Sequence, residues 1–105
     1  MSQIPDSLDH VGPGWHPILE QLHLDIIAVD PDYTTSQVKE KFGGLRVYLA
    51  SCRHPDVNAL IRAAEVRAQE TCEDCGAPGR IRNRAGRIWL QCLCDVCVDK
   101  EPGDG

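Results

Sequence analysis

Aromatic residues are scarce in this chain of 105 residues, at 5% of the sequence, although 42% of its residues are apolar. We therefore expect one small domain with a mainly aliphatic core. No run of about 18 apolar residues occurs, so the sequence predicts no transmembrane helix and no contact with membranes. The segment from Met1 to Asp6 has no basic stretch followed by an apolar one, which predicts no secretory signal and a cytoplasmic, reducing setting.

The motifs of common zinc enzymes are also missing. The sequence has neither the H-E-x-x-H pair of metalloproteases nor the H-x-E that precedes P-C-x-x-C in nucleic-acid deaminases. All four histidines come before the cysteine-rich segment: His10, His16, His23 and His54. We therefore expect a protein that is not an enzyme and keep a small enzyme as the least favoured alternative.

Positive charge is absent from the first third of the chain. Residues 1–35 contain six acidic residues and no lysine or arginine, whereas residues 36–70 carry a net charge of +2. The formal net charge of the whole chain is −5, which opposes non-specific binding of nucleic acid. This net charge is still compatible with a local basic face. The simplest interpretation of the acidic first third is a solvated surface.

A flexible lead-in is predicted over residues 1–13, because this segment contains proline and glycine and has little periodicity. A small α+β body is predicted over residues 14–70. Its first helix begins near Gly14 and has four apolar residues on one face: Ile18, Leu19, Leu22 and Ile26. A second, longer helix is predicted from Val57 to Glu70, because its apolar residues recur at helical spacing without an intervening glycine or proline.

Two alternating runs around Gly43-Gly44 predict a β-hairpin between these helices. The weaker alternative is a short helix over residues 36–42 that leads into a single strand. The last residues, 99–105, are charged and rich in glycine and proline, which predicts a flexible tail.

The most informative feature is a pair of C-x₂-C motifs separated by 18 residues. This spacing is typical of a structural zinc site, because each motif presents two sulfurs to a tetrahedral ion. The predicted ligands of one structural Zn²⁺ are Cys72, Cys75, Cys94 and Cys97. Residues 71–98 then form a zinc ribbon, in which a strand–turn–strand segment joins two cysteine knuckles. A thioredoxin-type redox pair and a rubredoxin-like iron site are the alternatives.

Two further cysteines need an assignment. Cys92 lies two residues before Cys94 and could compete as a ligand, but we expect it to be a free buried thiol. Cys52 has no matching partner nearby and is predicted to be a packing or surface residue.

Basic residues cluster in two places that could contact a partner or nucleic acid. One cluster lies in the predicted hairpin of the body and the other in the ribbon: Lys39, Lys41 and Arg46, then Arg80, Arg82, Arg84 and Arg87. The arginines could bind phosphate or an acidic partner. The simpler interpretation is that they form a solvated strand face or balance the charge of a zinc–thiolate cluster.

The block from Gln37 to Tyr48, followed by the C-x₂-C-G motif at Cys72, resembles a group of small uncharacterised zinc-ribbon proteins of bacteria and their phages. Those sequences carry a Q-V/I-K-E-K-F-G-x-L-R-x-Y block, then C-x₂-C-G, then an aromatic residue and C-x₂-C/H. The resemblance covers about residues 14–98. This chain has Cys97 where many of those proteins have histidine, which also suits zinc. The resemblance implies a zinc-binding accessory protein, often encoded by a phage, and no defined activity.

The sequence as a whole predicts an α+β fold with an N-terminal helix, a β-hairpin, a long helix and a C-terminal zinc-ribbon hairpin packed on it. The favoured function is that of a small accessory or regulatory protein that binds another protein. If a phage encodes it, the partner is a host factor and the setting is the host cytoplasm. The alternative is a nucleic-acid-binding zinc ribbon that uses the hairpin from Arg80 to Arg87.

Overall fold

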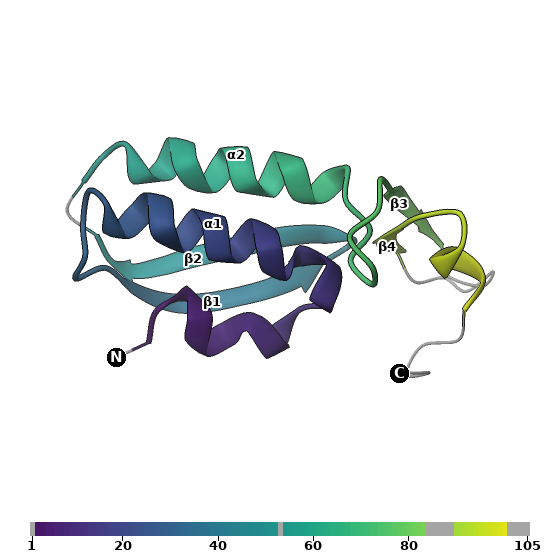
Figure 1. The fold of residues 1–105 in the computed structure, drawn as a ribbon. Coiled ribbons are helices and arrows are strands. Elements are labelled where there is room, and N and C mark those ends of the chain that lie inside the picture. The colour runs from purple at the N-terminus through teal and green to yellow at the C-terminus, as the bar shows by residue number, and fades with distance from the viewer. Residues whose placement is uncertain (1, 53, 84–89, 101–105) are drawn as a thin grey trace.

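The protein has an α+β fold, as the sequence predicts. The structure is a computed structural model that describes residues 2–52, 54–83 and 90–100. Helices α1 (His16–Ile27) and α2 (Val57–Gln69) lie side by side over a two-stranded antiparallel sheet (Figure 1). The sheet consists of β1 (Thr34–Lys41) and β2 (Gly44–Ser51). A second antiparallel hairpin, made of β3 (Arg80–Asn83) and β4 (Leu90–Leu93), follows beyond the C-terminal end of α2 (Figure 1).

Both helices bury the faces that their apolar periodicity predicts. In α1 the four expected residues are buried: Ile18, Leu19, Leu22 and Ile26. Pro17 occupies the first turn of α1, where its missing N–H costs nothing. In α2, Ile61, Ala64 and Ala68 recur at helical spacing and are buried, while Leu60, on the same face, is only partly buried at the margin of the core.

The predicted hairpin is confirmed, but its turn lies one residue earlier than the Gly43-Gly44 pair suggests. Phe42 and Gly43 have φ values of 53° and 84°, and Gly44 already begins β2. Two consecutive left-handed residues are typical of the tight turn that suits the twist of a hairpin. The carboxylate of Glu40 accepts a hydrogen bond of 2.7 Å from the Gly43 N–H and so stabilises this turn. The alternative helix over residues 36–42 is wrong.

The N-terminal segment differs from the flexible lead-in expected of it. It forms a 3₁₀ helix, η1 (Ile4–His10), and the side chain of Ile4 is completely buried in the main core. The Ile4 N–H donates to the Tyr33 hydroxyl at 3.1 Å, and the Thr35 N–H donates to the Ser2 carbonyl at 2.9 Å. One buried isoleucine and these long-range bonds hold the segment against β1, and neither leaves a periodic pattern in the sequence.

Buried apolar residues form two separate clusters. The larger one unites η1, both helices, the sheet and one residue of β4: Ile4, Val11, Trp15, Ile18, Leu19, Leu22, Ile26, Tyr33, Val38, Leu45, Val47, Val57, Ile61, Ala64, Ala68 and Cys92. The smaller one contains Cys72, Leu93, Cys94 and Cys97. Residues 84–89, which include Arg84 and Arg87, lie outside the described residues, as do residues 101–105 of the predicted tail.

Candidate metal centre

Four cysteine sulfurs meet beyond the end of α2. The Sγ atoms of Cys72, Cys75, Cys94 and Cys97 all lie within 4.8 Å of one another. The Sγ atoms of Cys75 and Cys94 are 3.7 Å apart, too far for a disulfide, and all six cysteines are free thiols. Four sulfurs about 2.3 Å from a tetrahedral zinc ion are separated by about 3.8 Å. The donor set therefore fits one metal ion of this kind.

The first knuckle is a tight turn between α2 and β3. The Cys72 N–H donates to the Ala77 carbonyl at 2.7 Å, and the Gly76 N–H donates to the Cys72 carbonyl at 2.9 Å. Gly76 has a φ of 86°, a conformation that favours glycine, and this residue lets the chain turn back after Cys75. The glycine that follows the C-x₂-C motif in the sequence therefore has the role that its position indicates.

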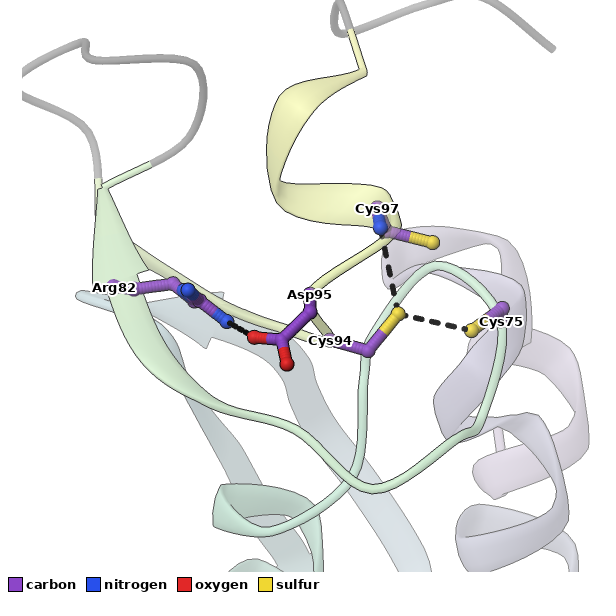
Figure 2. Close-up of polar contacts among 5 residues, drawn as sticks. All are labelled: Cys75, Arg82, Cys94, Asp95 and Cys97. Atoms are coloured by element: carbon purple, nitrogen blue, oxygen red, sulfur yellow. Dashed lines mark hydrogen bonds and ion pairs between the residues drawn. The ribbon is translucent and has the colours of Figure 1, made fainter.

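The second knuckle follows β4, and Figure 2 shows its two cysteines facing the Cys75 sulfur. The Cys97 N–H lies 3.4 Å from the Cys94 sulfur. This amide is the main cause that lowers the pKa of Cys94 to about 6. A backbone N–H directed at a cysteine sulfur stabilises the thiolate, the form that binds metal.

The Cys97 sulfur shows the effect of gathering thiols without a cation. Burial, followed by the neighbouring thiols, raises the pKa of Cys97 to about 12. Thiolates this close repel each other, and a divalent cation removes that repulsion by binding them together. The arrangement therefore suits a bound cation better than four independent thiols.

The N-terminal segment also supports the first knuckle, a contact that the sequence analysis missed. The Gly14 N–H donates to the Glu73 carbonyl at 2.7 Å, and the indole N–H of Trp15 donates to the Thr71 carbonyl at 2.9 Å. A Cβ atom on Gly14 would lie 2.0 Å from the Cys72 carbonyl oxygen, so only glycine allows this approach. The G-P-G sequence around Pro13 was the available signal, because glycines next to an apolar aromatic can mark close backbone contact.

The other two cysteines lie outside the four-sulfur cluster. Cys92 is fully buried in the main core, and its thiol donates to the Gln69 carbonyl at 3.2 Å. Burial raises the pKa of Cys92 to about 11, which keeps this thiol neutral. Cys52 is half-buried against the core, with its sulfur 3.6 Å from the His54 carbonyl.

The described arginines of the ribbon line a hollow beside the knuckles. Arg80, Arg82, Cys94 and Asp95 contribute to this open cavity of about 230 Å³. The Arg82 guanidinium donates to the Asp95 carboxylate at 2.8 Å (Figure 2). The same guanidinium holds the pKa of Asp95 below its usual value. Arg82 is therefore already paired within the ribbon, whereas Arg84 and Arg87 lie outside the part of the chain that the structure describes.

The three candidate cations of the first hairpin occupy the face of the β1–β2 sheet that the helices do not cover. Val38 and Val47 pair across the strands and are buried, so the alternate residues point to the opposite face. Lys39 pairs with Arg46 across the strands, and the Lys39 ammonium lies 5.9 Å from the centre of the Tyr48 ring. We refer to Gln37, Lys39, Lys41, Arg46 and Tyr48 as the open sheet face.

The structure thus defines a small α+β protein with four cysteines that can hold one metal ion. No protein-family model, curated protein or solved structure matches the chain. The resemblance of the block from Gln37 to Tyr48 to phage and bacterial proteins therefore stays a prediction. None of the helices within the described ranges is long and apolar enough to cross a membrane.

Proposed function

We propose that this protein binds one Zn²⁺ through Cys72, Cys75, Cys94 and Cys97 and uses it as a structural staple. The observation that carries the proposal is the approach of the four sulfurs to within 4.8 Å of one another. Zinc is favoured because four thiolates in tetrahedral arrangement match its preferred ligands and geometry. Such a site leaves no coordination position for water or substrate, so the metal serves folding and not catalysis.

The same proposal makes the protein an accessory factor that recognises another protein. The closed metal site offers no chemistry, and the charged pair beside it, Arg82 with Asp95, is already satisfied internally. The open sheet face and the acidic first third of the chain remain as surfaces for a partner. The resemblance to phage-encoded accessory proteins supports a regulatory role of this kind.

A second candidate function is binding of nucleic acid, favoured by three cations and a tyrosine ring on one open sheet face. Lys39, Lys41 and Arg46 would contact phosphate while Tyr48 stacks on a base. The net charge of −5 and the internal pairing of Arg82 count against it. Affinity that falls steeply with salt, and falls further in a Lys39→Ala/Arg46→Ala variant, would favour this candidate.

Metal analysis of the purified chain tests the proposal directly. We expect about one zinc per chain by elemental analysis, and loss of that zinc in Cys72→Ser and in Cys94→Ser. Cys52→Ser is the matched control and should retain the metal, since its sulfur lies outside the cluster. Iron in place of zinc, or zinc retained in both ligand variants, would overturn the assignment.

The partner is tested by purification from the native cytoplasm at moderate salt. One protein that co-purifies in stoichiometric amount, without nucleic acid, is the expected result. Nucleic acid that co-purifies in place of protein, and dissociates as the salt concentration rises, would replace this proposal with the second candidate.

A further inference from the structure

Within the part of the chain that the structure describes, no strand pairs with the outer edge of β2. β1 pairs with β2 along one side only, in a sheet of two strands. On the other side the Val47 N–H donates to the Glu65 carboxylate at 3.2 Å, and the Leu45 carbonyl accepts a bond of 3.1 Å from the Arg46 guanidinium. No backbone hydrogen bond from another described segment reaches Leu45 or Val47 on this side. Side chains therefore occupy the groups that a third strand would bind.

A groove runs beside this edge. It is an open hollow of about 420 Å³ between residues 47–49 of β2 and four residues of α2: Asn58, Ile61, Arg62 and Glu65. Strands of a sheet lie about 4.8 Å apart, whereas packed helices lie about 8–10 Å apart. Two packed helices are therefore wider than two strands, and the groove occupies the corner between α2 and the edge of β2.

The same geometry decides what can occupy the groove. If β2 of a second copy paired antiparallel with this edge, the two α2 helices would lie on the same face above strands about 4.8 Å apart, closer than the roughly 8–10 Å that packed helices need. An extended segment without a helix above it meets no such obstacle. The occupant is therefore a single strand of another protein and not a second copy of this chain.

Charge specifies the side chains of that strand. Successive residues of a strand point to opposite faces, so alternate side chains of the occupant would face α2 and the open sheet face. The groove is lined by three apolar residues, the buried Val47 and Ile61 and the partly buried Leu49, and by the polar Asn58, Arg62 and Glu65 of α2. Apolar side chains of the occupant are favoured where they meet the first three. The open sheet face carries Lys39, Lys41 and Arg46 and no acidic residue, which favours carboxylates.

We propose that β2 and α2 form a docking groove for an extended segment of a partner protein in which apolar and acidic residues alternate. The segment adds to the sheet as a third strand: its carbonyl accepts the Val47 N–H, and its N–H donates to the Leu45 carbonyl. The guanidinium of Arg46 moves from that carbonyl to an acidic side chain of the segment, and the Glu65 carboxylate releases the Val47 N–H. This inference rests on the proposed function as a protein-binding factor and names the chemistry of the partner.

A synthetic peptide tests the groove on the intact, metal-loaded chain. The probe is an eight-residue peptide of alternating valine and glutamate with blocked ends, titrated into isotope-labelled protein at moderate salt. We expect amide chemical shifts of β2 and α2 to change and amide exchange of Val47 to slow by about tenfold or more. A peptide with lysine in place of glutamate, and one methylated on its backbone nitrogens, should bind at least about tenfold more weakly.

Charge-reversal variants separate the groove from general electrostatics. Arg46→Glu should weaken binding of the glutamate peptide by about tenfold or more. Arg67→Glu makes the same change on an exposed part of α2 outside the groove and should leave the affinity within about twofold. The zinc content and thermal midpoint of both variants show whether each one is folded.

Three results would overturn the proposal. They are no binding of the glutamate peptide at about millimolar concentration, equal binding of the lysine peptide, or chemical shift changes confined to other parts of the chain. Tighter binding of a single-stranded oligonucleotide, abolished by Arg46→Glu, would also overturn it in favour of nucleic acid. If a protein still co-purifies through another surface, the groove is wrong while the proposed function stands. If zinc is absent as well, the proposed function fails separately.

Discussion

The two ends of this molecule obtain their stability in different ways. The body buries sixteen residues in one cluster that includes Trp15, Tyr33 and most of the apolar faces of α1 and α2. Among its described residues, the metal end has four in its buried cluster, and three of these are cysteines: Cys72, Cys94 and Cys97. One fully buried leucine contributes about 2 kcal/mol, whereas structural zinc contributes about 10–16 kcal/mol. The body is therefore expected to fold through its own core, and the metal end only when an ion joins its sulfurs.

The two regions nevertheless contact each other, and we refer to these contacts as the interface between the two regions. Gly14 and Trp15 of the body bond to the backbone of Thr71 and Glu73 in the first knuckle. Cys92 comes from β4, close to the second knuckle, yet its side chain belongs to the core of the body. Loss of structure at the metal end should therefore lower the stability of the body through these contacts, by a smaller but measurable amount.

Removal of the metal is expected to have the largest effect. A strong chelator under reducing conditions should abolish amide protection in residues 71–83 and 90–98, because about 10 kcal/mol of stabilisation is lost there. The amides of α1 and α2 should stay protected. Hydrogen exchange followed by NMR measures both regions in one sample.

Acid provides a second way to remove the metal, because protons compete with it for the thiolates. Amides of the metal end should again lose protection before those of α1 and α2. If the whole chain unfolded in one step in either experiment, the division into a self-supporting body and a metal-dependent end would be wrong.

Gly14→Ala should have the next largest effect, because it alters the interface between the two regions. The added methyl group would lie 2.0 Å from the Cys72 carbonyl oxygen, so the first knuckle must shift away. We expect a loss of about 2–3 kcal/mol in the free energy of unfolding, together with weaker metal binding. Gly44→Ala is the matched control, since its Cβ would come closest to the flexible end of the Arg46 side chain, at 3.1 Å, and would be in ordinary contact with the Lys41 carbonyl oxygen, at 3.5 Å. Equal effects of the two substitutions would show that this interface does not couple the stability of the two regions.

Cys92→Ala should separate a core cysteine from a metal ligand. The buried thiol packs in the body and bonds to the Gln69 carbonyl, so its loss should lower the free energy of unfolding by about 1–2 kcal/mol. Zinc content should stay at one per chain, since the Cys92 sulfur is outside the cluster. Urea unfolding and elemental analysis on the same preparation measure both quantities. If this variant loses zinc, Cys92 is a metal ligand and the assignment of its thiol to the core is wrong.

Much of this arrangement could be predicted from local sequence patterns. Helical periodicity located α1 and α2, and the spacing of Cys72, Cys75, Cys94 and Cys97 located the candidate metal site. These patterns are readable because each repeats a geometric rule, either one face of a helix or one pair of sulfurs per turn.

Features that depend on contacts distant in sequence could not be predicted. The segment around Ile4 is held by Tyr33, and Gly14 is required by the backbone of Cys72, which is 58 positions later in the chain. The turn of the first hairpin was misplaced for a different reason. Propensity favoured two glycines, whereas the Glu40 carboxylate stabilises a turn that places Phe42 in a left-handed conformation.

Alkali should test the body without removing metal ligands, through the hydroxyl of Tyr33. Burial is the main cause that raises the pKa of Tyr33 above its usual value of about 10. The folded state therefore keeps a proton that the unfolded state releases, so this contribution to stability is complete below about pH 10 and is lost as the pH rises further. In Tyr33→Phe the fall in urea midpoint between pH 8 and pH 10.5 should become shallower. Stability at pH 8 should drop by about 1 kcal/mol, because the Ile4 N–H loses its acceptor.

Tyr48→Phe is the control for this experiment, because Tyr48 is 45% exposed on the open sheet face. It removes the same hydroxyl from a side chain outside the buried core. Cys92, whose pKa is also raised by burial, weakens the body in alkali with the same sign but contributes equally to both variants. The difference between the two tyrosine variants therefore isolates Tyr33. A difference of zero would mean that the contact between Tyr33 and the N-terminal segment adds nothing to the stability of the body.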